Sequence, residues 1–248
     1  MTNKTTHFGF QEVPEEEKTF LVKNVFDSVS KRYDLMNDVM SFGLHRLWKQ
    51  YAIDVAQVKS GAMVLDLASG SGDLARALVK KVGPTGMVYA SDINFSMLRE
   101  GIDKSLDQGI HESISYVLAD AESLPFQSNL FDCVMISFGL RNITRKERAL
   151  NSIYRVLKPG GKLIVLEFSH PHSSIVRKIY DRYSFDILPK LGELIADDRE
   201  SYQYLAESIR KHPSQDMLKA MMEKSGFVMC KFHNLTFGIV AMHIGYKV

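Results

Sequence analysis

Short apolar runs alternate with amphipathic stretches between residues 62 and 168, and this alternation constrains the possible folds more than any other feature. Each run is short enough for a β-strand, and the stretches between the runs carry the apolar spacing of helices. Such alternation predicts a parallel, doubly wound sheet with helices on both faces. The predicted strands cover residues 63–68, 87–93, 114–119, 131–138 and 162–168, and the predicted helices cover 73–82, 95–108 and 145–157.

The alternation breaks after residue 168. Residues 170–226 carry helical patterns without a clear strand, and this segment is too long for a simple crossover. Two strand-like runs follow at 227–234 and 238–246, and the short connection between them suits an antiparallel hairpin and cannot make a parallel crossover. The sequence therefore predicts an α/β fold with a seven-stranded, mostly parallel sheet that ends in an antiparallel hairpin.

The segments outside the alternation are helical and rich in aromatic residues. Residues 15–33 and 44–58 are amphipathic, whereas residues 33–38 between them are rich in turn-forming polar side chains. The first ten residues have the composition of a loose tail. We expect segments 15–58 and 170–226 to form a helical cap over a ligand pocket, within a single domain of residues 1–248.

Charge and composition exclude several classes of function. The 31 basic and 29 acidic residues give a formal charge of +2, which argues against a protein that binds nucleic acid through a strong basic field. The longest uncharged apolar runs fall far short of the ~20 residues that span a bilayer, and the N-terminus lacks the apolar core of a secretory signal. Cys133 and Cys230 each lie in a strand-like run, so we expect buried, reduced thiols in a cytoplasmic protein. Because no two histidines have the spacing of a helical ligand pair and the cysteines occur singly, no metal site is expected.

The motif DLASGSG (residues 66–72) follows the first predicted strand. Glycines in such a turn let the backbone bend tightly and approach a ligand, and the next helix presents unpaired N–H groups. We therefore expect Gly70, Ser71 and Gly72 to contact a cofactor. Ala68 stands where the first glycine of this motif is usual, and NAD-binding domains share the same logic, so the motif alone does not identify the cofactor.

Asp92 lies at the end of the second predicted strand, roughly 20 residues beyond the last glycine of the motif. An acid at this place can accept hydrogen bonds from both ribose hydroxyls of a nucleoside. Its alternative role is to cap the helix predicted at 95–108. The loop and the acid together indicate a nucleoside-binding site.

Three further motifs distinguish the candidate cofactors. They are DAESLPF (120–126), FDCV (131–134) and LKPGG (157–161). Their order and spacing resemble those of the class I S-adenosylmethionine-dependent methyltransferases, which have a Rossmann-like sheet with an antiparallel C-terminal hairpin. The sequence after the fourth strand, SFGL (137–140), lacks the Asn/Asp-Pro-Pro-aromatic motif of enzymes that methylate amino groups of nucleic-acid bases, so this substrate class is disfavoured.

Motifs outside the shared cofactor site resemble those of the ubiquinone/menaquinone biosynthesis C-methyltransferases (the UbiE type) over nearly the whole chain. FGLRN (138–142) and YLAESI (204–209) are the most specific of them. The other matching stretches are THFGF (6–10), KRYDLMND (31–38), SFGLHRLWK (41–49), YSF (183–185), 198–210 and NLT (234–236).

This resemblance implies transfer of a methyl group from S-adenosylmethionine to a ring carbon of a polyprenylated quinol, with S-adenosylhomocysteine as the second product. The acceptor would be a methoxy-benzoquinol, demethylmenaquinol, or both. The resemblance places the cofactor against Ser71, Asp92, Asp120, Ala121 and Ser137. It also implies peripheral contact with the inner membrane surface, and a homodimer or association with other quinone-biosynthesis enzymes.

The chemistry of the reaction suggests two catalytic residues. A neutral aromatic carbon is a poor nucleophile, and ionising a phenol with a pKa near 10 at pH 7 costs about 4 kcal/mol. A nearby cation recovers part of this cost, and Arg141, just past the fourth strand, is the candidate for stabilising the phenolate or orienting a water. Alternatively, Arg141 is an exposed side chain in a charged loop that also contains Arg145 and Lys146, without a role in catalysis. Tyr33 could orient the quinol oxygen, or simply pack in the N-terminal helix.

Three other functions stay open at this point. An NAD-dependent oxidoreductase shares the loop and the acid, and a methyltransferase for another small metabolite, a protein or RNA shares the fold. A non-catalytic protein could retain the cofactor fold without turnover. The sequence does not identify the group that accepts the proton from the quinol.

Overall fold

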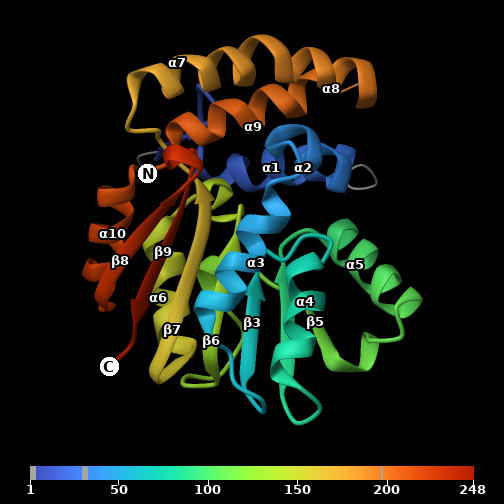
Figure 1. The fold of residues 1–248 in the computed structure, drawn as a ribbon, viewed down its shortest axis with the longest axis vertical. Helices are drawn as coiled ribbons and strands as arrows, with labels where there is room; N and C mark the ends of the chain where they lie inside the picture. Colours follow the sequence, from blue (N-terminus) through green and yellow to red (C-terminus); the bar gives the residue numbers. More distant parts are fainter. Residues whose placement is uncertain (1–3, 30–32, 197) are drawn as a thin grey trace.

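The central sheet of the computed structural model, which describes residues 4–29, 33–196 and 198–248, contains seven strands in the order β5-β4-β3-β6-β7-β9-β8 (Figure 1). Neighbours from β5 to β7 are parallel, whereas β9 runs antiparallel to both β7 and β8. This arrangement confirms the predicted sheet and its C-terminal hairpin. The strands are β3 (Met63–Leu67), β4 (Met87–Asp92), β5 (Ile114–Leu118), β6 (Phe131–Ser137), β7 (Leu157–Phe168), β8 (Val228–Leu235) and β9 (Val240–Tyr246).

Both faces of the sheet are buried under helices. Helices α3 (His45–Ala56) and α4 (Asp73–Val82) share one apolar cluster with Val64 of β3, while α6 (Lys146–Val156) and α10 (Gln215–Lys224) share another with Leu65. Helix α5 (Phe95–Asp107) packs against β4 and β5. Because adjacent residues of a strand point to opposite faces, burial on both sides requires the nearly continuous apolar runs seen in the sequence.

A second group of helices gathers at the end of the sheet where the parallel strands finish (Figure 1). Helices α7 and α8 are joined by a π-helical turn, and α1 and α2 lie between this layer and the sheet. The group comprises α1 (Glu15–Val29), α2 (Tyr33–Ser41), α7 (Ser174–Arg182), the turn Tyr183–Ile187, α8 (Leu188–Ala196) and α9 (Arg199–Lys211). We call this group the end helices. Helices α3 and α10, which the sequence analysis assigned to the cap, lie on the faces of the sheet instead, so the expected cap boundaries were too wide.

The N-terminal region is more ordered than its composition predicted. The expected loose tail contains β1 (Thr5–Phe8), which pairs antiparallel with β2 (Gln11–Pro14). The ring of Phe8 stacks on Tyr204 of α9 with 4.2 Å between centroids, and a side chain of α9, Glu207, accepts a hydrogen bond from the Phe10 N–H at 2.9 Å. The prediction of a tail was therefore wrong, because α9, far along the chain, holds these residues.

Two other local predictions need correction. The expected turn at 33–38 belongs to α2, where Met36 and Met40 are buried one helical turn apart. The helix expected at 15–33 is observed as α1 up to Val29, and residues 30–32 lie outside the described residues. Strand β7 begins at Leu157, earlier than expected, and its register against β6 shifts between Phe131 and Cys133. Short helical turns occur at His111–Ser113 (η2), Ala121–Ser123 (η3), Leu140–Asn142 (η4) and Thr236–Gly238 (η6).

Two further properties concern the described ranges only. Within them, no helix is long and apolar enough to cross a membrane. Cys133 and Cys230 are free thiols, and burial raises the pKa of Cys133 to about 12 and that of Cys230 to about 11. Cys230 is only partly buried, so the expectation of two fully buried thiols holds for Cys133 alone.

Candidate active site

A cavity lies where β3, β4, β5 and β6 end, between the sheet and α1. The space inside it and at its open mouth amounts to about 790 Å³. Thr19, Val22, Lys23 and Phe26 of α1 form the wall that faces the sheet. Ligands on open α/β sheets bind beyond the carboxyl ends of the strands, so this is the candidate active site.

The glycine-rich turn after β3 has the backbone shape that its sequence predicted. Ala68, Gly70 and Gly72 all have positive φ, of 53°, 56° and 75°. The alanine at the first of these positions adopts a conformation that glycine adopts at lower cost. A Cβ atom added at Gly139 would lie only 2.5 Å from the methyl carbon of Ala68. The turn after β3 and the loop after β6 therefore pack in direct contact.

Asp92 supports this turn from the end of β4. Its Oδ2 accepts a hydrogen bond from the Gly70 N–H at 2.8 Å, and its Oδ1 accepts one from the Asn94 N–H at 2.9 Å. Burial raises the pKa of Asp92 despite these backbone donors. The helix-cap role belongs to Asn94, whose side chain accepts from the Met97 N–H at the start of α5. Asp92 therefore lines the cavity, and the backbone N–H groups of Gly70 and Asn94 hold its carboxyl group in place.

The other predicted cofactor residues divide into two groups. Asp120 and Ala121 line the cavity together with Gly70 and Asp92. Ser71, Gly72 and Ser137 are not among the residues that line it. Ser71 is fully buried, and Gly72 is the N-cap residue of α4. The Oγ of Ser137, buried at the end of β6, has no hydrogen-bond partner within the described ranges.

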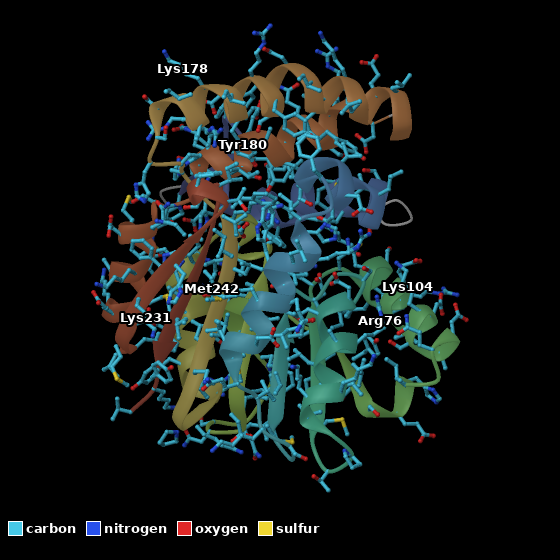
Figure 2. All side chains as sticks on the ribbon, in the orientation of Figure 1. Arg76, Lys104, Lys178, Tyr180, Lys231 and Met242 are labelled. Carbon is cyan, nitrogen blue, oxygen red and sulfur yellow. The ribbon has the colours of Figure 1, made fainter. Side chains whose placement is uncertain are left out.

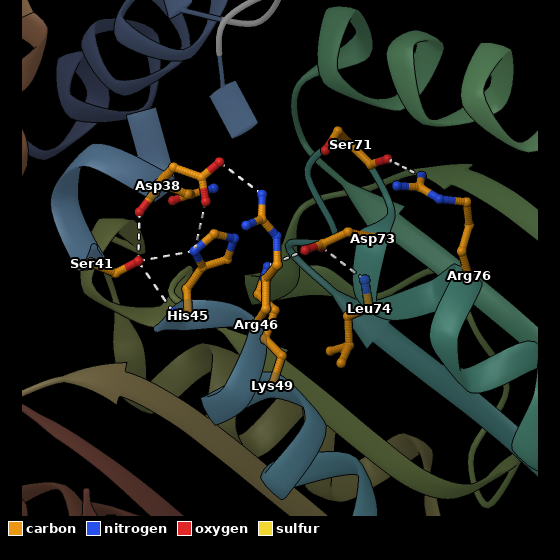
Figure 3. Close-up of polar contacts among 10 residues, drawn as sticks. Asp38, Ser41, His45, Arg46, Lys49, Ser71, Asp73, Leu74 and Arg76 are labelled. Atoms are coloured by element: carbon orange, nitrogen blue, oxygen red, sulfur yellow. Dashed lines mark hydrogen bonds and ion pairs between the residues drawn. The ribbon is translucent and has the colours of Figure 1, made fainter. Parts of the chain in front are cut away.

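A polar network outside the cavity fixes the start of α4 (Figure 3). The Lys49 ammonium of α3 contacts Asp73 at 2.7 Å, and the Arg76 guanidinium donates to the carbonyl of Ser71 at 2.6 Å. Although burial acts in the opposite direction, Lys49 holds the pKa of Asp73 below its usual value. The network therefore ties α3 to the glycine-rich turn.

Arg141 lies in the short turn η4 and is buried. Its guanidinium forms an ion pair with Glu167 of β7, with 2.8 Å between Nη1 and Oε1, and also donates to the carbonyl of Phe138. Its Nε is buried without a hydrogen-bond partner in the described part of the chain. Arg141 is thus neither an exposed loop arginine nor an uncompensated cation. Helix α2 begins at Tyr33, but the side chain of Tyr33 lies outside the described residues, so its role stays a prediction.

Two buried lysines near this end of the cavity were not singled out by the sequence analysis. Lys18 of α1 is 1 % exposed, and Lys146 of α6 is 6 % exposed. Lys18 precedes Val22 by one helical turn, so it is a charged residue on the buried side of α1, but it is not among the residues that line the cavity. That position was the available signal. No group of three or more His, Cys, Asp or Glu side chains among the described residues is placed to hold a metal ion.

Comparisons with known proteins agree with this geometry. The sequence profile described as the ubiE/COQ5 methyltransferase family matches residues 11–247. A protein of Methylococcus capsulatus named ubiquinone/menaquinone biosynthesis C-methyltransferase UbiE is 60% identical over 247 residues, covering 100% of both chains.

Solved structures share the fold at low sequence identity. A SAM-dependent methyltransferase from Aquifex aeolicus superposes with a TM-score of 0.60 at 17% identity, over 81% of this chain and 89% of that one. A phosphoethanolamine N-methyltransferase of Haemonchus contortus in complex with S-adenosyl-L-methionine gives 0.56 at 18% identity, over 76% and 49%. At such identities the likeness concerns the fold alone.

Proposed function

The chain belongs to the ubiE/COQ5 methyltransferase family, and we propose that it methylates a ring carbon of a polyprenylated quinol in ubiquinone/menaquinone biosynthesis. It is an S-adenosylmethionine-dependent C-methyltransferase. The observation that carries the proposal is the cavity at the carboxyl ends of the strands, with Asp92 on one side and α1 on the other. The acceptor on the ubiquinone path is a methoxy-benzoquinol and on the menaquinone path demethylmenaquinol.

The residues around the cavity fit S-adenosylmethionine, which supplies an electrophilic methyl group when bound. A carboxylate has about four acceptor sites, so Asp92 can accept ribose hydroxyls while it supports the turn. Asp120 and Ala121 are proposed at the adenine, and Gly70 at the close backbone approach. Ser71 and Gly72 would act by shaping the turn, and the unpartnered Ser137 hydroxyl would face the ligand.

We place the quinol ring at the end of the cavity formed by η4 and the residues after it. Asn142 lines this end, and its Oδ1 accepts a hydrogen bond from the Tyr204 hydroxyl of α9 at 3.0 Å. Glu167 compensates the charge of Arg141, so we propose that Arg141 acts on the quinol oxygen mainly through its free Nε–H donor. Tyr33 is retained as a proposed orienting residue.

The test is methyl transfer by the purified protein to short-tailed forms of the two quinols, followed by mass spectrometry. Each acceptor is offered in its reduced and its oxidised form, because only the quinol has a hydroxyl that can ionise. We expect product from at least one quinol and none from either quinone. Quinone analysis of cells lacking the protein then assigns the path. If neither quinol is methylated and another small metabolite is, the proposed acceptor is wrong.

We also propose that the outer surface of α7 and α8 contacts an anionic membrane, where prenylated quinols reside. Ile175 and Ile179 are 69% and 67% exposed one helical turn apart, and Leu194 is 83% exposed. Basic side chains flank them, and Figure 2 shows Lys178 on the outer side of α7, away from the sheet. An exposed apolar stripe with basic neighbours is the pattern of helices that lie on anionic bilayers.

Sedimentation with anionic or neutral vesicles tests this surface. The double variant Ile175→Ser/Ile179→Ser should lose at least tenfold in affinity for anionic vesicles, since each buried isoleucine contributes about 1.5–3 kcal/mol. Leu106→Ser on α5, also exposed, is the control and should bind as the wild type. Equal binding by both variants would contradict the proposal. The predicted homodimer and the association with other enzymes stay predictions.

A further inference from the structure

A groove lies in the outermost layer of the molecule, where α7 continues through the π-helical turn into α8 (Figure 1). The space within it and at its open mouth amounts to about 1120 Å³. It is separate from the cavity at the ends of the parallel strands, because the two share no lining residue. We call it the outer groove.

The irregular turn at the outer groove has a cause in the sequence. Pro189 has no N–H to donate to the carbonyl of Phe185, and in a regular α-helix its ring would collide with that carbonyl. The chain adopts a wider π-helical turn at Tyr183–Ile187, a feature that often occurs at functional sites. Three consecutive residues of this turn, 185–187, line the groove.

Apolar side chains form one side of the outer groove. Ile187, Leu191 and Leu194 follow one another at intervals of four and three residues, so they share one side of this helical segment. Ile187 and Leu194 are exposed, and Leu194 also belongs to the surface that we propose to contact the membrane. The ring of Phe185 is held in place by stacking on Phe10, with 5.9 Å between centroids.

Basic side chains give the outer groove its charge. Arg182, Lys190 and Arg199 line it together with one carboxylate, that of Asp186, so the lining has an excess of two positive charges. Arg199 is paired with Glu193 at 3.6 Å. Within the described ranges, Arg182 and Lys190 form no ion pair. Two exposed cations are therefore available to an anionic group.

The outer groove continues the apolar stripe of α7. Arg182 follows Ile175 by seven residues and Ile179 by three, positions that share one side of an α-helix. When the two isoleucines enter the interface of a bilayer, a long basic side chain in the same row can extend to the level of the lipid phosphates.

We propose that the outer groove binds one anionic phospholipid, whose headgroup phosphate contacts Arg182 and Lys190. Its acyl chain lies along Ile187, Leu191 and Leu194. This inference rests on the proposed membrane contact and names the lipid class that it selects. A planar guanidinium can hold two phosphate oxygens at once, and such charge-assisted hydrogen bonds are strong. A free anion would leave the apolar side uncovered, and an uncharged chain would not use the two cations.

Binding of a monomeric lipid tests the outer groove without the contribution of a membrane surface. Dihexanoyl phosphatidylglycerol is offered below the concentration at which it forms micelles, and its affinity is measured by calorimetry. Dihexanoyl phosphatidylcholine and inorganic phosphate are the comparison ligands. Arg182→Gln/Lys190→Gln removes the two cations. Arg177→Gln/Lys178→Gln is the matched control, because it removes an arginine and a lysine from exposed positions of α7 that do not line the groove.

We expect Arg182→Gln/Lys190→Gln to lose at least about tenfold in affinity for phosphatidylglycerol, and the control to stay within about twofold. Phosphatidylcholine should bind the wild type more weakly by about tenfold, since its ammonium group offsets the phosphate charge. Leu194→Ser should weaken phosphatidylglycerol by about threefold or more and leave inorganic phosphate unchanged. Urea unfolding and methyl transfer to a short-tailed quinol should be the same in the groove variant as in the wild type.

Three outcomes would overturn the proposal. The first is no binding of monomeric phosphatidylglycerol by the wild type, and the second is an equal loss in the groove variant and its control, which would indicate general charge attraction. The third is inorganic phosphate that binds as tightly as the lipid, which would indicate a site for free anions. Failure of the membrane contact would be seen separately, as unchanged vesicle binding by Ile175→Ser/Ile179→Ser, and failure of the proposed reaction as an absence of methyl transfer.

Discussion

Removing the guanidinium of Arg141 should lower the free energy of unfolding by about 3–5 kcal/mol, the cost of leaving one member of a buried ion pair without its partner. The side chains of Arg141 and Glu167 are 3% and 2% exposed, and Nη1 lies 2.8 Å from Oε1. After Arg141→Ala, the Glu167 carboxylate keeps the backbone donors of residue 141 and of Phe168, at 3.1 and 2.9 Å. It has lost its countercharge in a site that water does not reach.

The pair formed by Arg46 and Asp38 provides a matched control. Its atoms are 2.7 Å apart, but the side chains are 64% and 33% exposed. Pairs of this kind contribute about 0–1 kcal/mol, so Arg46→Ala should be nearly neutral. Because both pairs join an arginine to a carboxylate at almost the same distance, the difference between them reflects mainly the effect of burial.

Urea unfolding followed by circular dichroism measures these free energies. Glu167→Gln removes the stranded charge, so the double variant Arg141→Ala/Glu167→Gln should recover part of the loss, with a coupling of roughly 2–3 kcal/mol. A loss below 1 kcal/mol in Arg141→Ala would refute the reasoning.

Turnover measurements distinguish a structural role of Arg141 from a role in the chemical step. We expect both Arg141→Ala and Arg141→Lys to lower turnover, by ~10²-fold or more for alanine, with cofactor affinity within about threefold. If turnover stays low in the double variant although stability returns, Arg141 acts on the chemical step.

Three further outcomes follow from the same contacts. Asp92→Ala should weaken S-adenosylmethionine binding by about 1.5–3 kcal/mol in calorimetry. Because the pKa of Asp92 is raised, acidification should begin to weaken wild-type binding at a higher pH than for a site with an ordinary aspartate. Unchanged affinity in a folded Asp92→Ala variant would remove the assignment. Gly192→Ala in α8 should destabilise the protein by ~1–3 kcal/mol without changing cofactor affinity, because its Cβ would lie 2.4 Å from Tyr202 Cγ; undiminished stability would contradict this packing. The free energy of unfolding should rise between pH 7 and 10.5. In this range the lysines of the unfolded chain still bind a proton, whereas Lys146 and Lys18 in the folded protein, with pKa values of about 7 and 8, lose theirs. A flat profile in this range would contradict the lowered pKa values.

The sheet could be predicted because its determinants are local. Strands buried on both faces give apolar runs, and the turns after β3 and β4 carry their glycines and their acid in short, continuous motifs. For the same reason four residues that line the cavity could be named from the sequence, namely Gly70, Asp92, Asp120 and Ala121, although their contact with the cofactor stays a prediction. Each of these residues lies within a few positions of the end of its own strand.

The remaining features depend on partners far apart in the sequence. Periodicity indicated that 44–58 contains a helix, but not that its apolar side packs on the sheet beside Met135 and Ile164. The polar residues at 33–38 favour a turn in isolation, whereas burial of Met36 and Met40 stabilises a helix. Arg141 was considered as a catalytic cation or a surface residue, because nothing near it in the sequence reveals the carboxylate of Glu167 in the next strand.

The same division between local and distant contacts applies to the site that we propose. The turns along the cavity are β–α connections within the sheet, each built from one short stretch of sequence. The end of the cavity where we propose the quinol ring is formed by Asn142 of η4, which contacts Tyr204 of α9, and the stacking of Phe8 on Tyr204 joins the N-terminal hairpin to the same unit. On this proposal, a different acceptor requires changes in these inserted segments, whereas the sheet and its turns can stay the same.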